Sequence, residues 1–412
     1  MAAYTIDIMN PRHGTAALPD TLRAWTHARG TLIARVRRAR GRPASVDSPP
    51  FVPAMSAIAA HHDPASGIAM LAGTRADLAE AADEWAAAPE ADVAALGREL
   101  GQALHNSTTP PAWTTQIGSR AFHWGERTYV MGIVNVTPDS FSGDGLLADG
   151  DAWVDRAVEQ ALAFVAHGCD IVDIGGESTR PGAEPVSAED EAARVVPVIE
   201  ALRRQSDVPI SVDTFKASVA RAALDAGADL INDVWGLRLD PAMGPLAAER
   251  QVPVILMHNR SRPSDTTISE RLGGRYVGVD YDDLVLDLLE ELQAQVTVAE
   301  SQGIDRERIL VDPGLGFGKT VPQNLALLER CDALRALGLP ILLGPSRKSF
   351  IGYTLDRPPD ERLHGTMATL VVAIARGGVD MVRVHDVEAA VQVVRMADAI
   401  VGRGASSGAE RD

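Results

Sequence analysis

The chain has 412 residues, of which 46% are hydrophobic, and a formal net charge of -17 at pH 7. A negative charge of this size repels phosphates, which argues against general binding to nucleic acid or to anionic membranes. Two cysteines are too few for a disulfide framework and no apolar stretch is long enough to span a bilayer, so we expect a soluble protein of the cytoplasm.

Residues 1–115 are predicted to form an accessory N-terminal extension of unknown function, mostly helical or irregular. Thr74 and Asp77 have the spacing of a capping box, which predicts the start of one helix. The apolar stripe of a second helix comprises Val93, Leu96, Leu100 and Leu104. We interpret the arginine-rich run at 29–42 as a solvated charged face, in preference to a targeting or nucleic-acid element. The extension carries no chemical motif and is expected to stabilise the main domain.

From about Arg127 onward, short apolar runs alternate with loops and amphipathic stretches of helix length. The runs are VMGIVNV, DIVDIGG, PISVD, DLIND, PVILMH, RILVD, PILLG and DMVRVHD. Continuous apolar strands joined by helices indicate a parallel sheet covered on both faces. Eight such units are typical of a TIM barrel, so the predicted class is α/β, with a (β/α)8 barrel at 116–403 and a flexible tail at 404–412.

A polar side chain ends nearly every one of these runs. The strand-end residues are Asn135, Asp173, Asp213, Asn232, His258, Asp312, Ser346, Lys348, Arg383 and His385. A doubly wound open sheet would also show this alternation, but it would gather its ligand groups at one switch point. Polar residues at all the strand ends favour the barrel, whose active site lies at that edge.

Seven ordered motifs at these strand ends resemble those of dihydropteroate synthases, and the resemblance extends over residues 127–400. The motifs are NVTPDSFS at 135–142, GGESTRPG at 175–182, SVDT at 211–214, LINDV at 230–234, VDPGLGFGKT at 311–320, SRKSFIG at 346–352 and RVHDV at 383–387. The resemblance implies a transferase that condenses 6-hydroxymethyl-7,8-dihydropterin diphosphate with p-aminobenzoate, giving 7,8-dihydropteroate and pyrophosphate for folate synthesis. It also implies a homodimer.

A pterin presents a 2-amino-4-oxo edge with adjacent N–H donors, so its pocket needs carboxylate and amide acceptors and a donor for the oxygen. The pterin residues that the resemblance implies are Asp213, Asn232, Met257, Asp312, Phe317 and Lys348. Met257 and Phe317 would line the faces of the ring, and the others its polar edge.

Arg383 and His385 are two residues apart on the last strand, so their side chains project to the same side and can converge on one anion. This spacing predicts a diphosphate clamp. The resemblance adds Arg180 to the clamp, and Asn135 as the residue that helps to hold Mg²⁺ on the diphosphate. The predicted catalytic residues are Asp213, Lys348, Arg383 and His385.

The loops after the first two strands are rich in Gly, Pro and Ser and longer than a minimal turn. In the family they build the p-aminobenzoate site, which here implies Phe141, Thr179, Arg180, Pro181 and Ser346. Two segments depart from the family pattern. The first loop places its acidic residue one position later, at Asp144, and MHNRSRP after the fifth strand leaves His258 with no assigned role.

The residues by themselves are also compatible with two other functions. A methyltetrahydrofolate-dependent methyltransferase shares the barrel and pterin pocket but needs a corrinoid partner and no diphosphate clamp. A barrel that has lost catalysis would keep only binding.

GLGFGKT at 314–320 is not a nucleotide-binding P-loop, because Pro313 stands where that motif needs glycine. The N-terminal extension shows no kinase or aldolase-like motif of a bifunctional enzyme, so a chain lacking residues 1–110 is predicted to keep its activity.

Overall fold

The computed structural model describes residues 3–10, 18, 19, 22, 30–40, 57–137, 153–179, 183–277 and 279–404. The chain divides into two compact units. Unit 1 comprises Met1–Pro110, Tyr281–Ala294 and Glu329–Gly338, and unit 2 comprises Pro111–Asp280, Gln295–Leu328 and Leu339–Asp412. Two later segments of the chain therefore belong with the N-terminal residues.

Unit 1 contains a four-stranded antiparallel sheet and two helices that share its core. The sheet has the order β1-β2-β4-β3, with bounds Tyr4–Met9, Thr31–Arg38, Ile68–Thr74 and Ala59–Asp63. The helices are α2 (Arg75–Ala86) and α3 (Ala91–Asn106), and Trp85, Leu96 and Leu100 lie in one apolar cluster with residues of the sheet. Both predicted helices are confirmed, including the Thr74–Asp77 capping box. The sheet was not anticipated.

The arginine-rich run is not a solvated face, and this prediction was wrong. Its residues Thr31–Arg38 form β2, an inner strand between β1 and β4. The side chains of Arg35 and Arg37 are only 14% and 10% exposed, and they pair with Asp7, Asp283 and Asp287. Buried guanidinium groups need such partners. The acids come from distant parts of the sequence, so the run could not be read as buried from its own composition.

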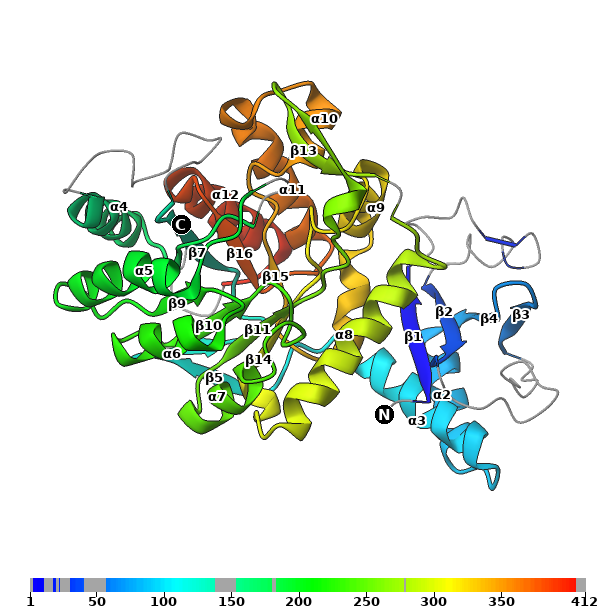
Figure 1. Ribbon diagram of the computed structural model, residues 1–412. Coiled ribbons are helices and arrows are strands. Elements are labelled where there is room, and N and C mark those ends of the chain that lie inside the picture. Colours follow the sequence, from blue (N-terminus) through cyan, green and yellow to red (C-terminus); the bar gives the residue numbers. More distant parts are fainter. Residues whose placement is uncertain are drawn as a thin grey trace, which may run out of the picture. The chain divides into compact units, whose positions relative to one another are not determined.

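Unit 2 is built on eight parallel strands that close into a barrel (Figure 1). They are β7 (Tyr129–Asn135), β8 (Ile171–Gly175), β9 (Ile210–Asp213), β10 (Leu230–Asp233), β11 (Val254–Met257), β14 (Ile309–Asp312), β15 (Leu342–Leu343) and β16 (Met381–Val384). The sheet order is β14-β11-β10-β9-β8-β7-β16-β15, and a parallel bridge between Val311 and Ile341 joins its two ends. Each strand coincides with one of the eight apolar runs, so the TIM barrel is confirmed.

Helices follow the strands, and in Figure 1 α4, α5 and α6 lie outside the sheet. The helices after β7 are α4 (Trp153–Ala166), α5 (Ala188–Arg203), α6 (Ala217–Asp225), α7 (Met243–Arg250), α8 (Leu284–Ser301), α9 (Val321–Glu329), α10 (Ser349–Leu355), α11 (Leu363–Ala375) and α12 (Val387–Val401). The short 3-10 helices are η4 (Pro263–Asp265), η5 (Arg306–Arg308), η6 (Cys331–Leu337) and η7 (Pro359–Glu361). Among the described residues, we find no helix with the length and apolar character needed to cross a membrane.

A hairpin and an aromatic cluster fill the N-terminal end of the barrel. The hairpin pairs β5 (Thr114–Ile117) with β6 (Arg120–His123). The rings of Phe122, Trp124 and Tyr129 pack against one another with centroids 4.6–5.8 Å apart. They pack in one cluster with the first residues of several strands, such as Ile171 and Leu230. Apolar side chains fill this end of the barrel, so we expect the polar site at the opposite end, where the strands have their carboxyl ends.

Candidate functional site

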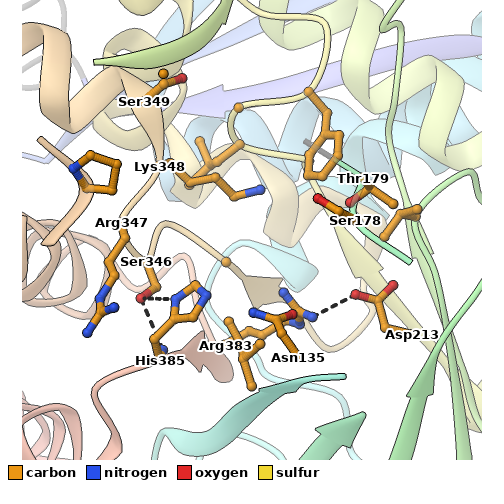
Figure 2. A pocket seen from close by; sticks show the side chains of 18 of the residues that line it. Asn135, Ser178, Thr179, Asp213, Ser346, Arg347, Lys348, Ser349, Arg383 and His385 are labelled. Carbon is orange, nitrogen blue, oxygen red and sulfur yellow. Dashed lines mark hydrogen bonds and ion pairs between the residues drawn. The ribbon is translucent and has the colours of Figure 1, made fainter. Parts of the chain in front are cut away.

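A pocket lies at the carboxyl ends of the barrel strands (Figure 2). The predicted residues that line it are Asn135, Thr179, Asp213, Asn232, Met257, Asp312, Phe317, Ser346, Lys348, Arg383 and His385. Phe141, Asp144, Arg180 and Pro181 lie outside the described residues. The structure thus gathers residues that are up to 250 positions apart in the sequence, from Asn135 to His385, around one cavity.

Arg383, which lines the pocket, links two aspartates, one of which, Asp213, also lines it. Its Nε donates to Oδ2 of Asp173 at 2.6 Å, and its Nη2 donates to Oδ2 of Asp213 at 2.7 Å. Asn232 donates from Nδ2 to the same oxygen of Asp173 at 3.3 Å. Asp173 is fully buried and was predicted only as a strand end, not as a site residue. Its inward position on β8, directly before the GGESTRPG loop, was the available signal.

The carboxylates of the pocket have raised pKa values. Burial, opposed by Arg383 and helped by the negative charge of Asp173, raises the pKa of Asp213 to about 7. Burial also raises the pKa of Asp312 to about 6, although the Gly314 N–H donates to its Oδ1 at 2.7 Å. One guanidinium therefore does not compensate these acids fully. A ligand that presents N–H donors would complete their hydrogen bonds.

Apolar side chains form a slot beside the acids. Met257, Phe317 and Val234 are buried in one cluster, with Phe215 and Trp235 packed against it. Nζ of Lys348 lies 3.9 Å from the centre of the Phe317 ring, within the range of a cation–π contact. A flat heterocycle can pack in such a slot while its edge faces carboxylates and an ammonium group.

The loops after β15 and β16 are tied to each other (Figure 2). Oγ of Ser346 lies 2.9 Å from Nδ1 of His385 and accepts the His385 backbone N–H at 3.1 Å. Arg347 has a left-handed backbone with φ of 54° and donates to both carboxylate oxygens of Asp386, at 3.0 and 2.6 Å. Lys348 therefore follows a residue fixed at both its backbone and its guanidinium. Arg347 and Asp386 belong to the SRK and RVHD motifs, but neither was predicted to have a role in the site.

Lys216 fixes the base of the loop after β8. Its Nζ donates to Oε2 of Glu177 at 2.7 Å, to the Val186 carbonyl at 2.8 Å and to Oε2 of Glu191 at 2.5 Å. Oε1 of Glu177 also accepts the Val186 N–H at 2.9 Å. Residues 177 and 186 are thus held together, and Thr179 between them lines the pocket. Lys216 was missed because no motif distinguishes it from a surface lysine.

A buried lysine organises the loop after β14. Nζ of Lys319 lies 3.1 Å from Nδ1 of His258 and donates to the carbonyls of Gly314 and Phe317, at 3.0 Å each. The glycine-rich loop therefore folds around its own lysine instead of offering that lysine to a phosphate, consistent with the rejection of a P-loop. His258 lies next to Lys319 and is not among the residues that line the pocket.

Comparisons with known proteins agree with this geometry. Residues 131–385 match the family model described as pterin binding enzyme. A dihydropteroate synthase of Clostridium beijerinckii is 46% identical over 288 residues, covering 70% of this chain and 100% of the relative. The structure of Xanthomonas albilineans dihydropteroate synthase with 4-aminobenzoic acid matches with a TM-score of 0.62 and 42% identity, over 71% of this chain and 99% of that one. Another structure from that organism, in complex with 7,8-dihydropteroate, matches with a TM-score of 0.60 and 39% identity, over 70% and 99%.

Proposed function

The chain belongs to the dihydropteroate synthases, a family of pterin-binding transferases, and we propose how its pocket residues divide the work of the condensation. The reaction joins 6-hydroxymethyl-7,8-dihydropterin diphosphate to p-aminobenzoate and releases pyrophosphate. The assignment rests on the carboxylate, amide and cationic side chains that line the pocket at the strand ends. The chain that holds them matches the full length of a synthase with 46% identity.

The pterin would occupy the acidic end of the pocket. Asp213, Asn232 and Asp312 would accept its N–H donors, and Lys348 would donate to its ring oxygen. The ring would lie between Met257 and Phe317, which already form an apolar slot. Arg383 would keep Asp213 in position through their 2.7 Å hydrogen bond. The two raised pKa values support this placement, because donors from the ring would stabilise the ionised acids.

The diphosphate would lie near Asn135, Arg383 and His385, and Arg180 would complete its binding site, as the family resemblance implies. Within the described residues no group of three or more His, Cys, Asp or Glu side chains could hold a metal ion, so these residues form no metal cage. Such a site suits Mg²⁺, which commonly binds one or two protein oxygens and several phosphate oxygens. The Asn135 amide oxygen would be the protein ligand. When bound, the ion would neutralise charge on the leaving diphosphate.

The chemistry would proceed by loss of the leaving group and attack of the amine. The bond between the pterin methylene carbon and the diphosphate oxygen breaks, and its electron pair leaves with the diphosphate. Asp213 and Asp312 stabilise the electron-poor pterin. The nitrogen of p-aminobenzoate then forms the C–N bond and gives up one proton to water or pyrophosphate. An aniline nitrogen is unprotonated at neutral pH, so the step needs no protein base.

The p-aminobenzoate would lie beside Thr179, Ser346 and Lys348, all of which line the pocket. Phe141, Arg180 and Pro181 are proposed to complete this subsite, as the family resemblance implies. The X. albilineans relative is described with 4-aminobenzoic acid, which supports a subsite for this compound. Its amine must face the pterin methylene, so its carboxylate points away from Asp213 and Asp312.

We also propose that the chain acts as a homodimer in the cytoplasm. Large apolar side chains are exposed together on α11 and α12, which contact each other. They are Val371 (41%), Val372 (43%), Met396 (63%), Ile400 (71%) and Val401 (40%). A second copy would cover this surface. The Met396→Glu/Ile400→Glu double variant should sediment as a monomer, and an unchanged sedimentation coefficient would reject this interface.

Cys169 and Cys331 are free thiols, which supports a reducing compartment.

The assignment is tested by pyrophosphate release from the purified full chain. The assay contains the pterin diphosphate and Mg²⁺, with or without p-aminobenzoate. We expect release that depends on p-aminobenzoate, together with dihydropteroate identified by mass spectrometry. A folded sample that releases no pyrophosphate would reject the synthase activity. Pterin binding without release would then support a non-catalytic barrel, and methyl transfer from methyltetrahydrofolate would support the methyltransferase.

A further inference from the structure

Lysine is rare in this chain, and each lysine follows a strand of the barrel. Of the 39 Lys and Arg residues, three are lysines and 36 are arginines. The lysines are Lys216 after β9, Lys319 after β14 and Lys348 after β15. Lys348 lines the pocket and Lys216 fixes the loop that carries Thr179, whereas Lys319 is buried and does not line the pocket. This arginine-rich chain therefore keeps one ammonium group in the interior beside its site.

Three acceptors surround the ammonium group of Lys319. Its Nζ donates to the carbonyls of Gly314 and Phe317 at 3.0 Å each and lies 3.1 Å from Nδ1 of His258. Lys319 is only 2% exposed, and His258 only 1%. Since an ammonium group has only donors, Nδ1 of His258 accepts and the ring proton lies on Nε2. Three donors that diverge from one nitrogen fit this place, and the planar fork of arginine does not.

The carbonyls that bind Lys319 belong to a wall of the pocket. Gly316 and Phe317 line the pocket. The backbone is left-handed at Gly314, Gly316 and Gly318, with φ of 67°, 77° and 58°, so the wall is a run of tight turns that needs glycine. The Phe317 N–H also donates to the Gly314 carbonyl at 3.1 Å. Lys319 therefore closes the turn that sets the position of the Phe317 ring.

Lys319 also supplies positive charge to Asp312. Oδ1 of Asp312 accepts the Gly314 N–H at 2.7 Å, and the carbonyl of the same glycine accepts from Lys319. Burial raises the pKa of Asp312 to about 6, and the Gly314 N–H and three cations act against it. The cations are Lys348, Lys319 and Arg383. Lys348 and Arg383 line the pocket and would bind substrate, whereas the charge of Lys319 serves Asp312 whether or not substrate is bound.

We propose that Lys319 is a positioning residue of the pterin site: its buried ammonium group sets the Phe317 ring and supplies charge to Asp312. His258 holds that ammonium group. The inference rests on the proposed function, because it takes Asp312 and Phe317 as contacts of the pterin. It gives a role to His258 and to the lysine of the GLGFGKT motif, which act through the residues that contact the substrate.

The test compares Lys319→Met with Asn324→Ala in the full chain. Methionine keeps the length of the side chain and removes its charge. Asn324 holds the same loop without a charge, because its Oδ1 accepts the Gly316 N–H at 2.6 Å and its Nδ2 donates to the Lys319 carbonyl at 3.1 Å. Steady-state pyrophosphate release is measured between about pH 5.5 and 9, with each substrate varied in turn.

Both variants loosen the loop, so both should raise the KM for the pterin diphosphate by about tenfold and leave the KM for p-aminobenzoate within about twofold. Only Lys319→Met removes charge from Asp312. In this variant alone, the acidic limb of kcat/KM for the pterin diphosphate should move to higher pH, by about half a pH unit or more. The comparison separates the charge of Lys319 from its hold on the loop.

Two variants of His258 test the proposal if Lys319→Met folds poorly. His258→Leu removes one acceptor, so the buried ammonium group loses its proton more readily and Asp312 loses part of the charge. The acidic limb should move in the same direction as in Lys319→Met, by a smaller amount. His258→Asn keeps an acceptor oxygen for Lys319, so its pH profile should stay close to that of the wild type.

An unchanged acidic limb in folded Lys319→Met, or an equal shift of that limb in Asn324→Ala, would overturn the proposal. A KM for p-aminobenzoate that rises as much as the KM for the pterin diphosphate would also overturn it, because the loop would then not act on the pterin in particular. Failure of the proposed function is a distinct outcome, since the wild type would then release no pyrophosphate at any pH.

Discussion

Two buried charge clusters, one in each unit, have opposite compositions. In unit 1 a single carboxylate lies between two guanidinium groups: Asp7 pairs with Arg35 and Arg330, each at 2.7 Å. In the barrel a single guanidinium lies between two carboxylates: Arg383 pairs with Asp173 at 2.6 Å and Asp213 at 2.7 Å. The two clusters contain the same kinds of group at the same distances, so distance alone does not separate a structural cluster from a binding site.

The pKa values separate them. Burial would raise the pKa of Asp7, but Arg330 and Arg35 outweigh it and lower that pKa below its usual value. In the barrel, burial outweighs Arg383 and raises the pKa of Asp213 to about 7. Oδ1 of Asp173 is buried without a hydrogen-bond partner among the described residues. The first cluster is electrostatically complete, whereas the second still needs donors, which a bound ligand can supply.

The largest effect is expected at Arg383. Replacement by Ala leaves two buried carboxylates without their cation and frees Asp213 to move, so kcat/KM should fall by roughly 100- to 1,000-fold. Steady-state pyrophosphate release measures this change, and Arg383→Lys should recover only part of the loss because lysine cannot make both hydrogen bonds. A folded Arg383→Ala variant with nearly wild-type kcat/KM would show that the two clusters do not differ in function.

The complementary change is Asp7→Asn. It removes the buried negative charge that Arg35 and Arg330 share, so the free energy of unfolding should fall by about 3 kcal/mol. The kcat/KM of the folded protein should stay within about twofold of the wild type, because Asp7 belongs to the complete cluster. Urea unfolding and steady-state kinetics check the two parts. A selective loss of kcat at full stability would contradict the structural role.

The same cluster bears on removal of residues 1–110. Asp287 is fully buried and pairs with Arg37, and Arg330 pairs with Asp7, so the truncation removes partners from both. Retained activity in the folded truncated chain stays our prediction. We expect that chain to unfold at lower urea concentrations than the full chain, by an amount at least as large as for Asp7→Asn. Equal midpoints would show that these ion pairs do not stabilise the protein.

A smaller effect is expected from Lys216→Met. Loss of the ammonium group releases Glu177 and Val186 at the base of the loop that carries Thr179. The KM for p-aminobenzoate should rise by about tenfold while the KM for the pterin diphosphate changes little, because the loop lies at the second-substrate end. Lys216→Arg should restore part of the KM. A uniform loss in kcat with both KM values unchanged would reject a positioning role.

A change of pH is expected to affect the two clusters with opposite signs. The pKa of Asp213 is raised in the folded protein, so its ionisation destabilises the fold, and stability from this group increases as pH falls from about 7 toward 4. The pKa of Asp7 is lowered, so its contribution is present above the usual value of 3.8 and is lost as pH falls below it.

Urea unfolding of the wild type, Asp213→Asn and Asp7→Asn at several pH values measures these contributions. The stability difference between the wild type and Asp213→Asn should change between pH 5 and 8 by about 2.5 kcal/mol, and that for Asp7→Asn should stay constant over this range. In the wild type, kcat/KM should also fall as pH drops below about 7 and Asp213 becomes protonated. If the stability differences of Asp213→Asn and Asp7→Asn from the wild type changed with pH in the same way, the two clusters would not differ in the pKa of their aspartates.

Much of the barrel could be predicted from the sequence, because each parallel strand is a continuous apolar run and the polar residues at its end mark the site edge. Asn135, Asp213 and Lys348 were found in this way. The links between them could not be predicted. Arg383 and Asp173 are 210 residues apart, and their pairing depends on β16 and β8 lying on either side of β7 in the sheet.

Other features were missed for local reasons. The hairpin of β12 (Thr266–Ser269) and β13 (Gly273–Tyr276) lies in a polar segment with two adjacent glycines, which the sequence pattern indicates only as a loop. Lys319 belongs to a glycine-rich motif, and only the folded loop shows that its ammonium group is buried. The arginines of β2 were read as exposed because charged residues usually are, and their acidic partners follow in the sequence about 250 residues later.

The most direct test of the account is the binding of a pterin to the full-length wild type, Asp213→Asn and Asp7→Asn, measured by titration calorimetry at pH 8. We predict one pterin per chain in the wild type and in Asp7→Asn with similar Kd values, and a Kd at least about 100-fold higher in Asp213→Asn, because the ring loses a charged acceptor. Equal affinity in Asp213→Asn and the wild type would contradict the assignment of the incomplete cluster as the pterin site.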